Sequence, residues 1–287
     1  MTAAIARYPR RFATLVKLEH SVFALPFAYV GAFLAVGGVP RASLLAWLTV
    51  AMIAARSLAM ALNRLIDADI DARNPRTSER ELPRGLLSKA QVGVFCLASL
   101  ALFLVAVSQL APVVRWLWPI PVVAFVVYPY LKRATWLCHV WLGLTLGLAP
   151  VAAWVSVTNE LPLEAWLLGA AVASWVAGFD VLYGLFDLDV DRAQGLRSIP
   201  ARFGPRGAFA VARALHMATP ILLSAAGLLL DVGFVYWLGV ISVAALLIRE
   251  HALVSPSDWR RLDAAFFTMN GAIALGFFGF VLVDALL

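Results

Sequence analysis

Nine apolar stretches, separated by short polar segments, run along almost the whole chain. They cover residues 20–39, 44–64, 91–111, 113–130, 138–157, 164–186, 208–230, 234–249 and 264–286. Most are close to the ~20 residues that an α-helix needs to cross a bilayer. The pattern therefore predicts an all-α fold, a polytopic membrane bundle of about nine transmembrane helices. Only Pro112 separates the third stretch from the fourth, and the eighth is short, so eight helices are the alternative.

The composition is that of a membrane protein. Hydrophobic residues make up 62% of the 287 residues and charged residues only 14%, with a mean hydropathy of +0.86. Globular proteins average about 45–50% apolar and about 25% charged residues, so we expect one transmembrane domain over residues 1–287 and no large soluble domain. The net charge of +6 does not indicate nucleic-acid binding, because so few charges are present. The two cysteines lie in apolar stretches and predict neither a disulfide framework nor a metal site.

The distribution of Lys and Arg predicts how the chain is oriented in the membrane. The opposite loops carry only Arg41 and Arg115. Nineteen of the 23 basic residues lie in the N-terminal tail and in the segments 65–90, 131–137, 187–213 and 249–263. Because Lys and Arg are enriched in cytoplasmic loops, we expect a multi-pass protein of the inner (plasma) membrane with a cytoplasmic N-terminus and cytoplasmic long loops. No small-residue cleavage signature follows the first stretch, so we interpret that stretch as a retained helix.

Two sets of polar side chains recur at four-residue steps, each where a predicted helix reaches the cytoplasmic side. They are Asn63, Asp67 and Asp71 in the second stretch and Tyr183, Asp187 and Asp191 in the sixth, with Asp180 about two turns before Asp187. Residues four apart share one face of a helix. A basic segment follows each set, which suggests an internal duplication, with motifs near 63–85 and 180–204 and two halves facing a shared site.

The repeated carboxylates need a positive partner. Ionised carboxylates on one helix face repel one another and are costly to desolvate at a membrane edge. Oxygen ligands without His or Cys suit a hard ion, and Mg²⁺ typically takes one or two carboxylates together with substrate phosphates. The alternative is two solvated helix ends whose aspartates pair with the following arginines. The repetition favours a metal site, and relief of the repulsion predicts that Asp67→Asn leaves the metal-free protein as stable as before or more stable.

A third element, Tyr128-Pro129-Tyr130-Leu131-Lys132-Arg133, ends the fourth stretch on the cytoplasmic side. Taken alone, it is typical of an interfacial aromatic belt followed by cytoplasmic basic residues. Beside two pairs of carboxylates, Lys132 becomes a candidate clamp for an anion.

Together, these motifs resemble those of the UbiA superfamily of intramembrane aromatic prenyltransferases, and the resemblance covers nearly the whole chain. The first family motif matches Asn63, Asp67 and Asp71, followed by Arg76-Thr77, Arg80 and Leu82-Pro83-Arg84-Gly85. The second matches Tyr183, Asp187 and Asp191, followed by Gly195, Ser198-Ile199-Pro200 and Phe203-Gly204, and the third matches Tyr128 and Lys132. The first stretch, from Lys17-Leu18-Glu19-His20 onward, differs from the better-known ubiquinone enzymes. It is similar to the 4-hydroxybenzoate polyprenyltransferase branch that includes enzymes of the futalosine menaquinone route.

The resemblance implies an activity and a set of site residues. The activity is Mg²⁺-dependent transfer of a polyprenyl group from a polyprenyl diphosphate to an aromatic acid, with release of diphosphate, in ubiquinone or menaquinone biosynthesis. The favoured acceptor is 4-hydroxybenzoate, and a dihydroxynaphthoate of the futalosine route is the alternative. Two Mg²⁺ ions, replaceable by Mn²⁺, would lie on Asp67, Asp71, Asp187 and Asp191, with Lys132 as a further catalytic residue. The implied substrate-binding residues are Asn63, Arg64, Arg76, Arg80, Tyr128, Tyr183 and Arg197.

Elementary chemistry explains these residue types. Metal ions and a fixed cation such as Lys132 neutralise the charge that grows on a departing diphosphate. An allylic cation needs aromatic faces and shielding from water, for which the candidates are Phe23, Phe27, Tyr128, Phe179 and Tyr183. Intramembrane arginines rarely face lipid, so Arg64 and Arg56 are candidates for binding the carboxylate of the acceptor.

Two other functions fit parts of the pattern. A secondary transporter also carries intramembrane carboxylates and repeats, but here the charged clusters lie at one face rather than at the midplane. A lipid-headgroup transferase of the CDP-alcohol type also uses aspartates at the membrane edge, but its Asp-Gly-x-x-Ala-Arg arrangement is absent from the sequence. If the prenyltransferase interpretation holds, Asp69 and Asp189 should matter little, because each points about 200° away from the neighbouring acidic face.

Overall fold

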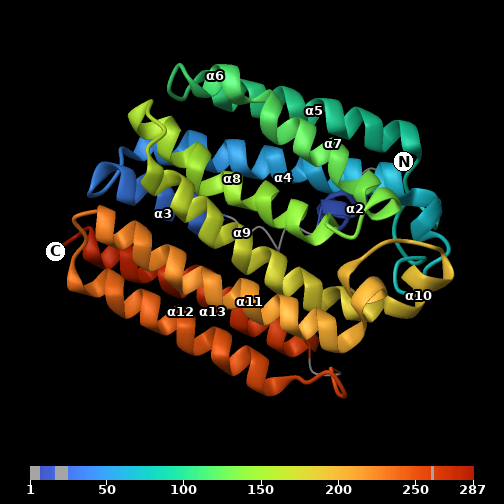
Figure 1. Ribbon diagram of the computed structural model, residues 1–287. Coiled ribbons are helices and arrows are strands. Elements are labelled where there is room, and N and C mark those ends of the chain that lie inside the picture. The colour runs from blue at the N-terminus through green and yellow to red at the C-terminus, as the bar shows by residue number, and fades with distance from the viewer. Residues whose placement is uncertain (1–6, 17–24, 260–261) are drawn as a thin grey trace.

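The computed structural model describes residues 7–16, 25–259 and 262–287, and the long helices within them lie side by side along a common direction (Figure 1). Apart from one isolated bridge between Ser255 and Asp258, the regular elements of these residues are helical. They are α2 (Arg7–Val16), α3 (Leu25–Val36), α4 (Ala42–Asp71), α5 (Lys89–Ser108), α6 (Val114–Leu117), α7 (Pro119–Ala134), α8 (Cys138–Thr158), α9 (Leu163–Tyr183), the 3₁₀-helix η2 (Gly184–Asp187), α10 (Leu188–Ala193), α11 (Ile199–Leu229), α12 (Phe234–Leu253) and α13 (Leu262–Asp284).

The predicted all-α membrane fold is confirmed, whereas the count of nine spans stays a prediction. Within the described residues, seven helical segments are long and apolar enough to cross a membrane. Two of these, α5 and the joined pair α6 and α7, are separate, so the third and fourth stretches do not merge. The first and ninth stretches form shorter apolar helices, Leu25–Val36 and Thr268–Asp284. Residues 17–24, which include the start of the first stretch and Phe23, lie outside the described residues.

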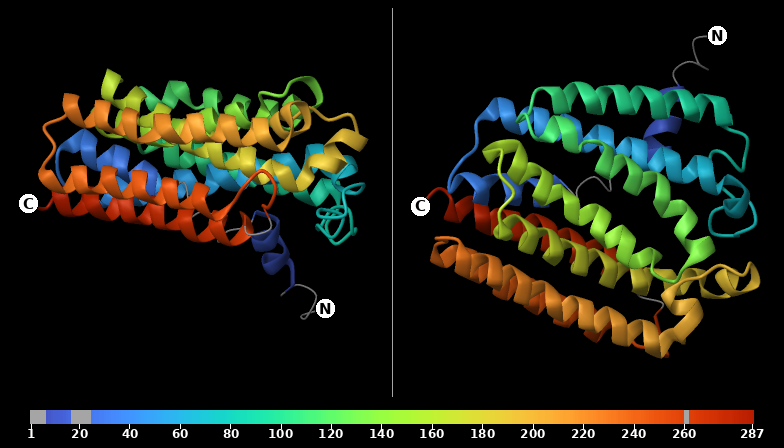
Figure 2. Two further views of the ribbon diagram at one scale, coloured as in Figure 1. Left: turned by 60° about the horizontal axis from the view of Figure 1, so that its bottom comes forward. Right: turned by 45° about the horizontal axis from the view of Figure 1, so that its top comes forward.

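The centre of the bundle is α9, which packs closely against α8 on one side and α11 on the other. Glycines allow the close crossing of α8 and α9, because a Cβ atom on Gly147 would collide with the carbonyl oxygen of Gly169. The same helix contributes Trp175 and Phe179 to the largest buried cluster, where they meet Phe27 of α3. Figure 2 shows α9 between its neighbours from two further directions.

The elements that carry the acidic motifs meet at one end of the bundle. The α4–α5 connection and α10 lie together at the end opposite the C-terminus (Figure 1). With 30 residues, α4 is about 45 Å long, longer than the ~30 Å hydrocarbon core of a bilayer. Its C-terminal turns carry Asn63, Asp67 and Asp71, so the excess length accommodates these polar side chains near the membrane edge.

Candidate active site

The first acidic motif occupies one continuous face of α4, as predicted. The helix runs through Asp71 without a break, and the Asn63 amide lies 3.5 Å from Oδ2 of Asp67. Both carboxylates are almost fully enclosed, with exposed fractions of 1% for Asp67 and 4% for Asp71. A buried carboxylate is stable only when it is paired and hydrogen-bonded, so its partners define the chemistry of the site.

The partners of Asp67 come from the C-terminal end of α7. Nζ of Lys132 lies 2.8 Å from Oδ2 of Asp67, and an Arg133 terminal nitrogen lies 3.0 Å from Oδ1. The same guanidinium donates to the carbonyl oxygen of Ile66 at 2.9 Å. The sequence identified Lys132 but missed Arg133, which looked like an ordinary cytoplasmic basic residue; its position directly after Lys132 was the available signal.

Asp71 is held by the connection that follows α4. One terminal nitrogen of Arg80 donates to both carboxylate oxygens, at 2.8 Å and 2.7 Å. The Thr77 hydroxyl donates to the backbone carbonyl of Asp71 at 3.0 Å. The connection therefore folds back over the end of α4 and brings Arg80 to the carboxylate.

The second motif departs from the predicted single helical face. The α-helix ends at Tyr183, and η2 carries the chain to Asp187 before α10 begins. A 3₁₀-helix has about 3.0 residues per turn rather than 3.6, so Tyr183, Asp187 and Asp191 do not form one regular stripe. Ring atoms of His139 occupy the space where a side chain at Gly184 would lie, so the residue at the start of this turn must be small.

Asp187 binds the α4–α5 connection from the opposite side of the site. The Arg76 guanidinium forms a two-pronged ion pair with it, in which Nε donates to Oδ1 at 2.9 Å, and the Asn74 amide donates to the same oxygen at 2.9 Å. The Arg76 guanidinium also lies 5.4 Å from the centre of the Tyr183 ring. Burial opposes the charge on Arg76, but hydrogen bonding and attraction to Asp187 outweigh it and raise the pKa of Arg76 above its usual value. Sequence reasoning missed Asn74, which follows Asp71 by three residues.

Lys132 joins the two motifs. Besides its ion pair with Asp67, it interacts electrostatically with Asp187 and with Asp191. Tyr128, one turn earlier in α7, likewise interacts with Asp67 and with Asp180. The three elements that the sequence singled out therefore converge on one site.

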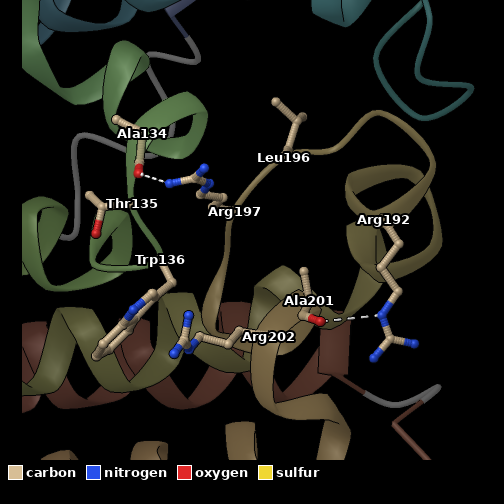
Figure 3. Close-up of a pocket in the computed structure, with 8 residues that line it drawn as sticks. All are labelled: Ala134, Thr135, Trp136, Arg192, Leu196, Arg197, Ala201 and Arg202. Atoms are coloured by element: carbon tan, nitrogen blue, oxygen red, sulfur yellow. Dashed lines mark hydrogen bonds between the residues drawn. The ribbon is translucent and has the colours of Figure 1, made fainter.

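Arg197 is not brought to the aspartates. Its guanidinium donates to the Ala134 carbonyl at 2.6 Å, and its backbone N–H donates to the carbonyl of Lys132 at 2.7 Å. It lines a separate surface pocket of about 370 Å³ with Arg192, Arg202 and Trp136 (Figure 3). Asp191 instead accepts a hydrogen bond of 2.8 Å from Ser198, the residue that caps α11.

Arg64 lies deeper in the bundle, one turn before Asp67. It is only 5% exposed, and its Nε has no hydrogen-bond partner among the described residues. It interacts electrostatically with Asp71 but forms no ion pair with a described residue. Arg56 lies on α4 two turns before Arg64, and its Nε is also buried without a hydrogen-bond partner among the described residues. Both arginines are thus available to bind a negatively charged ligand.

The remaining two aspartates of the motifs lie on the outside. Asp69 has a side chain that is 86% exposed and pairs with Lys89 at 3.4 Å. Asp189 is exposed as well. Their positions agree with the predicted orientation away from the acidic faces.

The donor set of the site fits a hard divalent cation that is shared with a phosphate. Within the described residues, no group of three acidic, His or Cys side chains is placed to enclose a metal ion. The carboxylates of Asp67, Asp71, Asp187 and Asp191 offer only oxygen ligands, from two converging elements. Mg²⁺ is commonly held by one or two carboxylates and by substrate phosphates rather than by a closed protein cage, so this arrangement suits it.

Comparison with known proteins gives a consistent result. The sequence pattern of the UbiA prenyltransferase family matches residues 24–280. A 4-hydroxybenzoate octaprenyltransferase of Cupriavidus pinatubonensis is 29% identical over 265 residues, which are 92% of this chain and 90% of the relative. The protein of the same name from Aeromonas salmonicida is 29% identical over 279 residues, 97% of this chain and 93% of the relative.

Two solved structures share the fold. A UbiA homolog from Aeropyrum pernix superposes with a TM-score of 0.85 at 32% identity, over 94% of this chain and 98% of the homolog. A UbiA homolog from Archaeoglobus fulgidus, bound to GPP and Mg²⁺, superposes with a TM-score of 0.73 at 19% identity, over 95% of this chain and 99% of the homolog. The second likeness concerns the fold alone.

Proposed function

The chain belongs to the UbiA prenyltransferase family, and from this premise we propose that it transfers a polyprenyl group from a polyprenyl diphosphate to 4-hydroxybenzoate and releases diphosphate. The names of the relatives from Cupriavidus and Aeromonas support this acceptor. The product is a precursor of a quinone. A dihydroxynaphthoate acceptor is the alternative and is one arm of the experiment below.

One observation carries the proposal, namely the meeting of both acidic motifs around Lys132. Four cationic side chains bind three carboxylates there, and they come from α7 and from the α4–α5 connection. A diphosphate carries more negative charge than a carboxylate, so the same cations can turn to its oxygens. Fixed positive charge placed where negative charge grows lowers the barrier to breaking the C–O bond of the prenyl diphosphate.

The metal ions belong to this proposal. Asp67 and Asp71 on one side and Asp187 and Asp191 on the other would hold Mg²⁺, as two ions, with Mn²⁺ able to substitute. The GPP- and Mg²⁺-bound structure of the Archaeoglobus homolog supports a metal in this fold. When bound, the ions supply Lewis-acid neutralisation of the leaving diphosphate.

The acceptor site lies deeper along α4. Burying a guanidinium without a partner is costly, and Arg64 and Arg56 both carry an unpartnered Nε in this part of the chain. An aromatic carboxylate would satisfy such a group. Three buried aromatic side chains would shield the prenyl cation from water. The ring centroid of Trp175 lies 4.9 Å from that of Phe27 and 5.2 Å from that of Phe179.

We also propose that the aspartate-bearing end of the bundle faces the cytoplasm. Nineteen of the 23 Lys and Arg residues support this orientation, since they lie in the loops of that side or in the N-terminal tail. The protein would then reside in the inner membrane, where it would receive a lipid-soluble prenyl donor and a water-soluble acid.

A reconstituted assay tests the function. Purified protein in lipid nanodiscs is given Mg²⁺, labelled geranyl diphosphate and, in separate reactions, 4-hydroxybenzoate or a dihydroxynaphthoate. We expect prenylated 4-hydroxybenzoate and an equal amount of diphosphate, both lost with EDTA. Product from the naphthoate alone would replace the acceptor and keep the reaction class. Failure to release diphosphate with any acceptor would contradict the enzyme and favour a transporter.

A further inference from the structure

A buried histidine holds an aspartate just behind the site described above. His139 is the second residue of α8, and Asp180 lies in the last turn of α9. Nδ1 of His139 is 2.7 Å from Oδ2 of Asp180, and the side chains are 7% and 20% exposed, respectively. Neither residue belongs to the cation-bound carboxylates or to the arginines assigned to the substrates.

Several contacts hold the histidine ring in place. Asp180 engages Nδ1, and Cys138 interacts with the ring. A Cβ atom on residue 184 would lie 2.9 Å from Cε1 of His139, so the ring lies against the backbone where α9 passes into η2. Its Nε2 is buried and has no hydrogen-bond partner among the described residues. The imidazole is therefore positioned to orient Asp180 rather than to bind solvent.

Asp180 interacts with residues of the site as well as with His139. Its carboxylate interacts electrostatically with Tyr128, which also interacts with Asp67. Asp180 and Tyr183 are three residues apart on α9 and so share a helix face, and the Tyr183 ring contacts Arg76. Only Oδ2 has a hydrogen bond within the described part of the chain, and the side chain keeps a fifth of its surface accessible although α9 is the most buried span. A carboxylate at this depth is costly and marks a functional position.

We propose that Asp180, positioned by His139, accepts the hydroxyl proton of the aromatic acceptor. This inference rests on the proposed function and assigns a proton acceptor to it. The free oxygen of Asp180 would accept a hydrogen bond from the phenol, which makes the ring more electron-rich where the prenyl group attaches. His139 is suited to support this role, because an imidazole ring nitrogen can donate to a carboxylate or, in the other tautomer, accept from a carboxylic acid.

The proton balance closes without a further reactant. The C–O bond of the prenyl diphosphate breaks, and its electron pair leaves with diphosphate. A ring carbon beside the hydroxyl forms the new C–C bond with a π pair, the O–H pair becomes the π bond of a ring ketone, and Asp180 takes the proton. The hydrogen on the newly substituted carbon leaves as a proton to diphosphate, its C–H pair restores the aromatic ring, and Asp180 returns its proton to the oxygen.

Variants of the two residues test the assignment. Asp180→Asn keeps the shape and removes the proton acceptor, and general-base groups typically contribute about 10²–10⁴-fold. We expect kcat with geranyl diphosphate and 4-hydroxybenzoate to fall at least about 100-fold, with the KM for geranyl diphosphate unchanged. His139→Leu should lower kcat in the same way, and His139→Gln, which retains a donor, should restore part of it. Asp189→Asn, an exposed aspartate nine residues further on, is the matched control and should behave as wild type.

A panel of ring-substituted 4-hydroxybenzoates separates a proton acceptor from a structural role. Phenols that are more acidic need less help, so the deficit of Asp180→Asn should shrink as phenol acidity rises. The overturning results are a kcat within about twofold of wild type, or a deficit that is equal for all phenols, which a lower melting temperature would explain as a structural role. The melting temperature of each variant is therefore measured in the same nanodiscs. If wild-type protein prenylates no acceptor, the proposed function itself fails; if only the variants behave as wild type, the function stands and this assignment falls.

Discussion

Lys132 and Asp67 form the shortest link between the third motif and the first, with 2.8 Å between Nζ and Oδ2. The Asp67 side chain is almost fully buried, and the Lys132 side chain is 28% exposed. The same lysine interacts with the aspartates of the second motif. Lys132 is therefore a cation through which both acidic motifs would act on a bound diphosphate.

Removing the lysine charge should weaken the binding of diphosphate. We expect Lys132→Gln to raise the KM for geranyl diphosphate and to lower kcat. The substitution removes a positive charge that stabilises both the bound diphosphate and the diphosphate as it leaves. The matched control is Lys89→Gln, which breaks the exposed pair with Asp69, worth at most about 1 kcal/mol. Steady-state kinetics of both variants check this. Equal kinetics for the two variants would contradict the assigned role of Lys132.

The pairing of Asp67 reverses one expectation drawn from the sequence. Relief of repulsion predicted that Asp67→Asn would not destabilise the metal-free protein, but Asp67 is paired with Lys132 and Arg133. We now expect a lower melting temperature in EDTA, by less than the ~3–5 kcal/mol of a fully buried pair, because both cations are partly exposed. Activity should be abolished. A melting temperature equal to or above that of wild type would restore the original expectation.

The outward-facing aspartates should be nearly neutral. Alanine at Asp69 or Asp189 removes an exposed carboxylate, and surface ion pairs contribute about 0–1 kcal/mol. We expect turnover within about twofold of wild type at saturating Mg²⁺, against loss of activity for alanine at Asp67 or Asp187. The four variants are assayed side by side. A loss at Asp69 or Asp189 as large as at Asp67 would mean that the metal carboxylates are wrongly assigned.

Two glycines test the packing of the bundle. Gly147 allows α8 to touch α9, and an added Cβ would collide with the Gly169 carbonyl, whereas Gly93 in α5 faces open space. Overpacking typically costs about 1–3 kcal/mol, so Gly147→Ala should lower the melting temperature. Gly93→Ala should hold or raise it, because glycine in a helix interior is about 0.5–1 kcal/mol less favourable than alanine. Thermal unfolding in detergent compares them, and a more stable Gly147→Ala would contradict the close crossing.

The topology can be read by labelling. Cys96 and Cys138 are both buried, so single cysteines introduced into a cysteine-free protein would report cleanly. We expect a cysteine at Arg84 to react only when the reagent reaches the cytoplasm, and one at Gly38, in an opposite loop, to react from outside. Reaction of the Arg84 cysteine in intact spheroplasts with an impermeant reagent would overturn the proposed orientation. The same set, extended to both termini, counts the spans: an odd number places the termini on opposite sides.

The sequence by itself determined the membrane helices and the identity of the acidic motifs. Apolar stretches near 20 residues leave few alternatives to membrane helices, since backbone groups in lipid must be satisfied within the helix. The four-residue spacing of Asn63, Asp67 and Asp71 was equally local, and α4 preserves it through Asp71. The internal duplication of the two halves stays a prediction, as do the metal ions and the acceptor.

Only the tertiary structure decided the partners of each carboxylate. Arg76 could have served either motif, and it reaches Asp187, 111 positions away, because the α4–α5 connection folds across the site. The second motif lost its regular helical face to η2, where His139 packs against Gly184 from another helix. Such outcomes depend on contacts between segments far apart in the chain, and side-chain spacing carries no information about them. The pairing of His139 with Asp180 is of this kind: 41 positions separate them, and only the packing of α8 against α9 brings them together.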